Sequence, residues 1–211
     1  MLIKLENPTL LLKSVELISD LVTDVRIKVN ELGLGITAID PANVAMVGFK
    51  LPKSSFSHFE TDKEVLGINS DSLKQILRRC SPKSSLTLEK KEGVLNIQIQ
   101  DRIRRNFNLS LIDIESDDKE MPNLEYTSVV EINSLDLIAS IQDCAVDADA
   151  CSFIVKDGKF IIEAKGLNSA KSEFSSDEAK IEAENCKAKY SLEYLGKFMK
   201  GAKLFEKTIL K

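Results

Sequence analysis

The alternation of apolar and polar residues predicts a chain built from short strands and a few amphipathic helices. Residues 2–6 alternate as a strand, and Asn7-Pro8 then favours a helix start, because Asn caps helices and Pro suits the first helical position. In the helix expected to about residue 22, Leu11, Val15 and Ile18 share one face. The same patterns predict strands at 25–31, 34–39, 44–51, 64–68, 85–90, 94–101 and 103–113, and a helix at 71–80.

The stretch at 33–56, GLGITAIDPANVAMVGFKLPKSSF, is predicted to form a hairpin around the turn Asp40-Pro41-Ala42-Asn43. Asp40 can accept hydrogen bonds from turn N–H groups, Pro41 presets φ, and Asn43 tolerates unusual backbone angles. The second strand is apolar on both faces, with Val44, Met46 and Gly48 on one face and Ala45, Val47 and Phe49 on the other. We therefore expect one face to be covered by something else, which is either core or a binding partner.

An acidic segment without periodicity, IESDDKEMPNLEY at 114–126, is predicted to be a linker. The pattern restarts after it, with strands expected at 127–132, 151–156, 159–165, 170–176, 179–190 and from 208, and with helices at 133–148 and 192–203. The expected organisation is an N-terminal domain at 1–113, a linker at 114–126 and a C-terminal domain at 127–211.

The restart is an internal repeat. VRIKVNELGLGITA resembles CSFIVKDGKFIIEA, and SLKQILRRC resembles YLGKFMKGA, in the same order in each half. The repeat predicts an α+β fold of two topologically similar domains, each with two helices against antiparallel sheet. Three strands follow the second helix in the first half, but the second half reaches Lys211 within the first of them, so we expect two C-terminal strands of the pattern to be absent.

Composition narrows the functional classes. The 211 residues carry a net charge of −4, which by itself disfavours nucleic acid, although a local basic face can outweigh the total. Neither an 18-residue apolar run nor a signal-peptide layout is present, so we expect an intracellular protein with no membrane partner. The four cysteines form no CxxC pair and are interpreted as small core residues, and a single histidine, His58, disfavours a zinc site.

Two helices in equivalent places of the repeat are basic. The first carries Lys74, Arg78 and Arg79, and the second carries Lys197, Lys200 and Lys203, at spacings that place each set on one helical face. Such faces can follow a phosphate backbone without reading bases. They can equally be solvated residues that complement the helix dipole. Both interpretations stay open on the residues alone.

Catalysis is not expected. Asp143, Asp147 and Asp149, next to Cys144 and Cys151, offer the one candidate metal site, of the kind that nucleases use. An aspartate-rich helix end is more often a solvated surface. The chain also lacks a phosphate-binding glycine loop and a nucleophile motif, so neither an enzyme nor a cofactor is predicted.

The stretch at 33–56 resembles the signature of the proliferating cell nuclear antigen family of DNA sliding clamps. The likeness rests on Ile39-Asp40, Asn43-Val44, the alternating apolar strand and Phe56 at the expected distance. It extends to the helix at 71–80, the linker with Met121-Pro122 and SLEYLGKFMKGAKL near the end. The absence of eukaryotic landmarks favours an archaeal type.

The resemblance implies a subunit of a toroidal trimer, a polymerase processivity factor that encircles double-stranded DNA with its helices lining the hole. The implied phosphate contacts are Lys13, Lys74, Arg78, Arg79, Lys197, Lys200 and Lys203. One departure is that the helix starting at Ser134 has no Lys or Arg, where many relatives carry them. The location implied is cytoplasmic and nucleoid-associated, or nuclear in a eukaryote.

The resemblance also implies a pocket beneath the linker for short peptide motifs of DNA polymerase, the clamp loader, flap endonuclease and DNA ligase. The matching residues are Ile39, Pro41, Ala42, Asn43, Val44, Met46, Met121, Pro122 and Tyr126. Subunits are expected to pair edge strands through Arg105, Phe107, Leu109, Leu111, Lys171, Glu173 and Phe174. The ring is either a homotrimer or a heterotrimer. The alternatives are a checkpoint-type clamp subunit and a metal-dependent nuclease.

Overall fold

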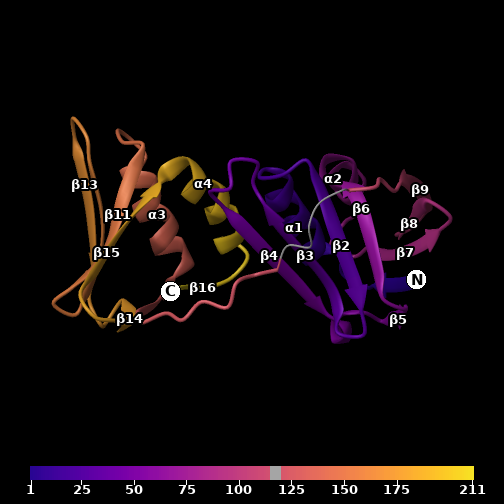
Figure 1. The fold of residues 1–211 in the computed structure, drawn as a ribbon, viewed down its shortest axis with the longest axis horizontal. Helices are drawn as coiled ribbons and strands as arrows, with labels where there is room; N and C mark the ends of the chain where they lie inside the picture. Colours follow the sequence, from indigo (N-terminus) through magenta and orange to yellow (C-terminus); the bar gives the residue numbers. More distant parts are fainter. Residues whose placement is uncertain (115–119) are drawn as a thin grey trace. The chain divides into compact units, whose positions relative to one another are not determined.

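A computed structural model describes residues 1–114 and 120–211, and the chain divides into two compact units, Met1–Pro122 and Asn123–Lys211 (Figure 1). This division falls inside the linker expected at 114–126, of which residues 115–119 lie outside the described residues.

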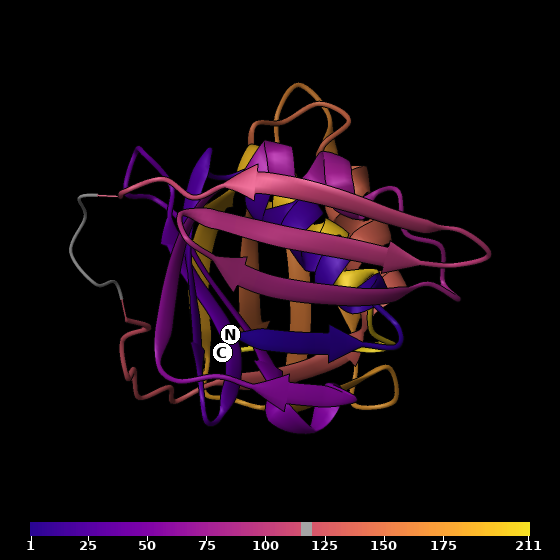
Figure 2. The same ribbon diagram turned by 90° about the vertical axis from the view of Figure 1, so that its right-hand side faces the viewer.

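In its described residues, unit 1 contains two antiparallel sheets, two α-helices and a short 3-10 helix, η1 (Lys53–Ser55). Its elements are β1 (Leu2–Leu5), α1 (Thr9–Ser19), β2 (Asp24–Asn30), β3 (Gly33–Ile39), β4 (Met46–Pro52), β5 (His58–Glu60), β6 (Glu64–Asn69), α2 (Ser70–Leu77), β7 (Ser85–Lys91), β8 (Val94–Gln100) and β9 (Arg104–Ser110). One sheet has the order β5-β1-β7-β8-β9, and the other β4-β3-β2-β6. Figure 2 shows the five-stranded sheet in front, with both helices of the unit behind it.

Unit 2 repeats this plan. Its elements are β10 (Val129–Asn133), α3 (Ser134–Cys144), β11 (Ala150–Lys156), β12 (Lys159–Lys165), β13 (Ser169–Phe174), β14 (Ala179–Glu182), β15 (Cys186–Ser191), α4 (Leu192–Ala202) and β16 (Lys207–Leu210). The sheets have the orders β13-β12-β11-β15 and β14-β10-β16. The repeated segments form equivalent hairpins, β2–β3 and β11–β12, and equivalent helices, α2 and α4. The predicted α+β clamp-type fold is confirmed.

Two strand predictions need correction. The single strand expected at 179–190 is two strands in different sheets, because β14 pairs with β10 whereas β15 pairs with β11. The chain changes sheet at residues 183–185, where the Asn185 side chain accepts a hydrogen bond from the Asp157 backbone N–H. The short strand β5 was missed, since three residues are too few to show a period.

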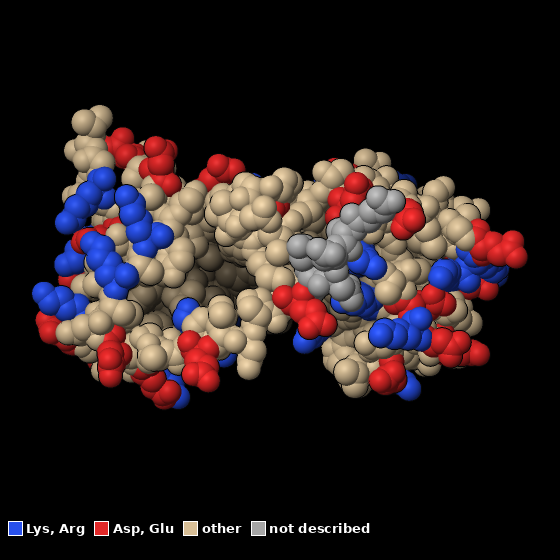
Figure 3. Space-filling view, viewed as in Figure 1, with Lys and Arg blue, Asp and Glu red and all other residues tan. Residues whose placement is uncertain are grey.

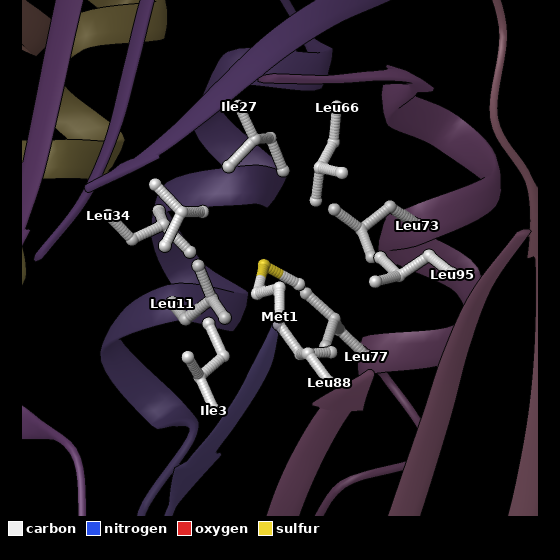
Figure 4. A pocket seen from close by; sticks show the side chains of 11 residues that line it. Met1, Ile3, Leu11, Ile27, Leu34, Leu66, Leu73, Leu77, Leu88 and Leu95 are labelled. Carbon is white, nitrogen blue, oxygen red and sulfur yellow. The ribbon is translucent and has the colours of Figure 1, made fainter. Parts of the chain in front are cut away.

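The core of unit 1 is shared by both sheets and both helices. Apolar side chains from all four surround a void of about 10 Å³ (Figure 4). Leu77 of α2, Leu73 beside it and Leu66 of β6 are each no more than 3% exposed. A void of this size with only apolar walls gives water no hydrogen-bond partner, so the core is dry.

Within the described residues, no helix has the length and apolar character to cross a membrane.

The cysteines divide by environment. Cys144 and Cys151 are buried in the core of unit 2, and burial raises the pKa of Cys151 to about 11. Such thiols are poor nucleophiles near neutral pH. Cys80 is half-buried, and burial together with the nearby Asp101 raises its pKa to about 11 as well. The prediction of a core residue is wrong for Cys186, which is exposed on β15, an edge strand of its sheet.

The hairpin turn forms as predicted. The buried Asp40 carboxylate accepts hydrogen bonds from the backbone N–H groups of Val44 at 2.7 Å, Ala45 at 2.6 Å and Ala42 at 3.1 Å, and Asn43 has φ of 55°. Because these bonds hold residues 40–45 in the turn, β4 begins at Met46 and not at Val44.

On both sides of residues 115–119, the chain that follows β9 contacts the outward face of the β4-β3-β2-β6 sheet. At one edge, Ile112 N donates to Gly67 O at 2.9 Å, and a Cβ on Gly67 would stand 2.1 Å from Ile112 O. At the other edge, a Cβ on Gly48 would stand 3.0 Å from Cγ of Met121. Glycine at these two positions therefore permits the linker to approach the sheet.

Replacing Gly67 with Ala is expected to displace the linker where it meets the sheet. The added methyl would overlap the Ile112 carbonyl, and overpacking of this kind costs about 1–3 kcal/mol. Hydrogen exchange at the Ile112 amide should accelerate and the melting temperature should fall. Gly35→Ala is the matched control, since its Cβ would meet only Phe49 O at 3.7 Å. Equal exchange rates at Ile112 in the two variants would refute this anchoring role.

Replacing Asp40 with Ala is expected to destabilise the hairpin. Three backbone N–H groups would lose their acceptor, and a buried donor left without one costs about 1–3 kcal/mol. Amide exchange at Ala45 should rise, and thermal unfolding followed by circular dichroism should begin earlier. Asp40→Asn, which keeps one acceptor oxygen, should lose less. An Ala variant as stable as the wild type would contradict the turn's dependence on this carboxylate.

Candidate nucleic-acid interface and peptide-binding surface

The cations predicted to face DNA in unit 1 come from α1 and α2, which lie side by side. Lys13 in α1 and Arg78, the C-cap residue of α2, share one acceptor. Lys13 Nζ lies 2.8 Å from Oε2 of Glu16, and Arg78 Nε lies 2.7 Å from Oε1 of the same carboxylate. Hydrogen bonds from Lys13 and then Arg78 hold the Glu16 pKa below its usual range. The structure therefore joins these two cations across the helix pair.

The other two cations of unit 1 differ in their surroundings. Lys74 is paired with Asp71 on the same helix, and its side chain is 17% exposed. Arg79 is exposed and has no ion-pair partner in the part of the chain that the structure describes. Three of the four cations thus have a carboxylate neighbour, which lowers the local positive potential and holds the side chains in place.

The cations of unit 2 come from α4 and the residue that caps it. Lys197 lies 3.2 Å from Glu193 and stands over the Tyr194 ring at 5.1 Å. Lys200 is in the last turn, and Lys203 is the C-cap, so both are close to the negative end of the helix dipole. The structure is thus compatible with both interpretations of these basic faces.

Helix α3 presents a surface without cations. Its exposed residues include Leu135, which is 71% exposed, Asp136 and Asp143, and Val146 follows at 83%. The helix ends at Cys144, so the prediction that it reaches residue 148 is wrong, and Asp147 and Asp149 lie in the loop beyond it. Asp147 accepts hydrogen bonds from the Asn168 backbone and side chain at 2.7 and 3.0 Å. Among the described residues no group of three potential metal ligands forms.

Basic residues also gather outside the helices. Figure 3 shows Lys side chains over the β13-β12-β11-β15 sheet of unit 2. The lysines on these strands are Lys156, Lys159, Lys165, Lys171, Lys187 and Lys189. Glu163 lies within 4 Å of two of them, Lys165 and Lys187, at 3.7 and 3.5 Å. Positive charge is therefore not unique to the helices, which supplies a matched control for any test of them.

Six of the nine residues predicted for the peptide pocket belong to the β3–β4 hairpin of unit 1. Ile39 and Met46 are cross-strand partners, and the turn residues Pro41, Ala42 and Asn43 are exposed. Val44 is 65% exposed, and Met121 is 50% exposed with its side chain against Gly48. Pro122 is the last residue of unit 1, whereas Tyr126 belongs to unit 2. The hairpin face that was expected to be covered by core or by a binding partner is thus partly covered by the linker, through Met121.

A groove of about 510 Å³ lies beside these residues, on the outward face of β2, β3 and β4. Sequence reasoning missed it. We call it the linker groove; it is lined by Lys28, Asn30, Leu32, Gly33, Leu34, Gly35, Thr37, Gly48, Phe49, Lys50, Leu51, Pro52, Glu120 and Met121. The signal that could have revealed it is the set of glycines at positions 33, 35 and 48, which put no side chain at three places on this face.

The two strands predicted to pair between subunits are both at sheet edges, β9 in unit 1 and β13 in unit 2. Their predicted residues do not all point outward. Leu109 and Phe174 are buried in their own units at 9% and 8% exposure, and Phe107 is half-buried. Arg105 pairs with Asp101, Lys171 pairs with Glu173, and Leu111 lies beyond the end of β9. An edge strand still offers its free backbone groups to another strand.

Comparison with known proteins places the chain in a family. A family model described as "Proliferating cell nuclear antigen, N-terminal domain" matches residues 1–120. The chain is 34% identical over 200 residues to "DNA polymerase sliding clamp" of Pyrococcus horikoshii, covering 89% of this chain and 78% of that protein. It is 33% identical over 200 residues to "DNA polymerase sliding clamp 1" of Thermococcus kodakarensis, covering 92% and 80%. Together with the two repeated α+β units, these matches show that the chain belongs to the proliferating cell nuclear antigen family and resembles its archaeal members.

Proposed function

We propose that this protein is a DNA sliding clamp, which encircles duplex DNA and keeps a DNA polymerase attached to its template. The observation that carries the proposal is the repetition of a basic helix, α2 and α4, at equivalent places in the two units of a family member. The protein acts topologically and supplies no chemistry of its own. It works in the nucleoid of the cytoplasm.

Ion pairing of the basic residues suits sliding. Phosphates compete with Glu16, Asp71 and Glu193 for the cations of α1, α2 and α4, so each contact with DNA is weak and readily exchanged. Contacts of this kind carry no sequence information and weaken with salt. The cation-free surface of α3 contributes little to them. The structure thus supports a clamp that holds DNA by enclosure more than by affinity.

The edge strands β9 and β13 support a ring. A free edge in each unit allows β9 of one subunit to pair with β13 of the next, and such head-to-tail pairing closes when the rotation per subunit closes. We propose a trimer built in this way, either of identical or of related subunits. The hairpin end of unit 1, with Val44, Met46 and Met121, is the proposed site for peptide motifs of the polymerase, the clamp loader, flap endonuclease and DNA ligase.

Changing Lys74, Arg78 and Lys200 together to Ala is expected to shorten retention on DNA. Each lost phosphate contact makes the negative slope of log affinity against log salt shallower by about one. Clamps loaded on a nicked circular plasmid can be followed by gel filtration over a series of salt concentrations. Client-peptide binding should be unchanged.

The control for that experiment is Lys180→Ala, Lys187→Ala and Lys189→Ala, which removes the same charge from strands β14 and β15. It should leave retention close to the wild-type value. If both triple variants behave like the wild type at moderate salt, the helices do not contact DNA and this part of the proposal is wrong.

Combining Met46→Ala with Pro122→Ala is expected to weaken binding of a client peptide about tenfold or more, equivalent to about 1.4 kcal/mol. Both substitutions remove apolar surface from the proposed pocket. Isothermal calorimetry with a synthetic peptide bearing an aliphatic and two aromatic anchors in one helical turn measures the loss. Leu167→Ala, at a side chain 98% exposed in unit 2, is the control. An undiminished affinity in the double variant would remove this pocket.

A further inference from the structure

The edge strand β15 of unit 2 is paired on one side only. Its partner is β11, and among the described residues no backbone hydrogen bond joins residues 186–190 to a strand on the other side. All six residues of β15 are exposed. At its first residue, the Cys186 thiol lies 3.6 Å from the Ser128 hydroxyl. An edge of this kind offers its unpaired N–H and C=O groups to a further strand.

The equivalent edge of unit 1 already holds another part of the chain. There β6 pairs with β2 and precedes α2, just as β15 pairs with β11 and precedes α4. The Gly67 carbonyl of β6 accepts a hydrogen bond at 2.9 Å from the backbone N–H of Ile112, in the chain that follows β9. One unit thus shows that this edge of the fold accepts a polypeptide backbone, and the repeat presents the same edge a second time.

The exposed lysines make the edge at β15 basic. Lys187 and Lys189 share one face and lie about 7 Å apart along the strand. Lys189 forms no ion pair with a described residue. Lys187 lies 3.5 Å from Glu163, but Lys165 shares that carboxylate at 3.7 Å, so the three side chains together keep one positive charge in excess. Residues 185–191 contain no acidic side chain.

The opposite face of β15 is partly apolar. Cys186, Ala188 and Tyr190 alternate with the lysines, and Tyr190 is 41% exposed with its ring centroid 5.0 Å from that of Phe153. A strand added at this edge would place alternate side chains on the two faces. Opposite charges on neighbouring strands stabilise their pairing, whereas like charges destabilise it. A second copy of β15 is therefore disfavoured at this edge, and an acidic strand is favoured.

We propose that β15 binds an extended acidic segment of a partner protein, which adds to the sheet as a further strand. Its carboxylates lie opposite Lys187 and Lys189, and they alternate with apolar residues that lie beside Tyr190. Backbone hydrogen bonds supply the affinity and the alternation supplies the specificity, as in other cases of strand addition. Because Glu184 and Glu193 flank the strand, the acidic segment extends little beyond the six residues of β15. This site does not depend on the proposed binding of DNA.

The test uses labelled eight-residue peptides with blocked ends, in which Val alternates with either Glu or Gln. A third peptide has the same Glu and Val residues in two separate blocks. Fluorescence anisotropy with the full chain at low salt should show at least tenfold tighter binding of the alternating Glu peptide than of the other two. Added salt should reduce its advantage over the Gln peptide, because that advantage arises from charge.

Backbone pairing is tested with two further versions of the alternating Glu peptide, N-methylated at its odd or at its even positions. In a paired strand only one of these two sets of N–H groups faces the neighbouring strand. At least one version should therefore lose binding. Amide exchange within β15 should also slow when the unmethylated peptide is bound, at the N–H groups that point away from β11.

Two double variants of equal charge locate the site. Lys187→Gln with Lys189→Gln should abolish the advantage of the Glu peptide over the Gln peptide. Lys159→Gln with Lys171→Gln removes the same charge from β12 and β13 of the same sheet and should keep that advantage. Melting temperatures close to that of the wild type confirm that both variants are folded.

Equal affinities for the Glu and Gln peptides, or an equal loss in the two double variants, would overturn the assignment. Full binding of both N-methylated peptides would refute strand addition. If a short DNA duplex binds through Lys187 and Lys189 and the peptides do not, the edge recognises phosphate and the acidic segment is wrong. Retention on circular DNA should be unchanged by Lys187→Gln with Lys189→Gln, so failure of this site and failure of the proposed clamp function are distinguishable.

Discussion

Burial of the apolar stripes of α1 and α2 against both sheets of unit 1 is the constraint from which its functional surfaces follow. Leu11, Leu73 and Leu77 contribute to one core with strands from each sheet. A helix that buries these residues must turn its polar side away, which carries Lys13, Glu16 and Lys74 outward. A strand that buries Ile27 or Leu34 must likewise turn Lys28 and Gly35 to the opposite face. The basic helix surface and the linker groove are thus two results of one packing arrangement.

Carboxylates on α1 and α2 reduce the positive charge of the basic surface that these two helices form. Glu16 connects two cations from different helices, and the hydrogen bonds that it accepts keep its pKa low, so it stays ionised at any physiological pH. An ionised carboxylate between cations positions them and competes with phosphate at the same time. We propose that such a surface attracts DNA only weakly, as a protein that moves along the duplex requires.

The outward sheet face depends on residues without side chains. Gly67 lets the backbone at Ile112, just before the linker, come close enough for a hydrogen bond, and Gly48 makes room for Met121. The linker therefore rests on the sheet at two edges and leaves the groove beside it. Because the walls of that groove include Glu120 and Met121, its shape depends on the position of the linker.

The sequence by itself determined most of the local structure. Periodicity placed the helices and nearly all strands within a few residues, and the side chains of Asp40 and Asn43 specified the turn, because each of these signals acts between neighbours in the chain. The repeat gave two similar units, and the stretch at 33–56 gave the family.

Only the tertiary structure decided which segments far apart in the sequence contact one another. The same alternation in 179–190 is compatible with one strand or with two, and the choice depends on whether β10 or β11 is the partner. Pairing of Glu16 with Arg78, 62 residues away, cannot be read from either helix alone. The groove at Gly35 likewise arises because strands and linker residues far apart in sequence meet there. Periodicity reports which face of an element is buried, whereas the partner on each face is fixed by contacts that only folding creates.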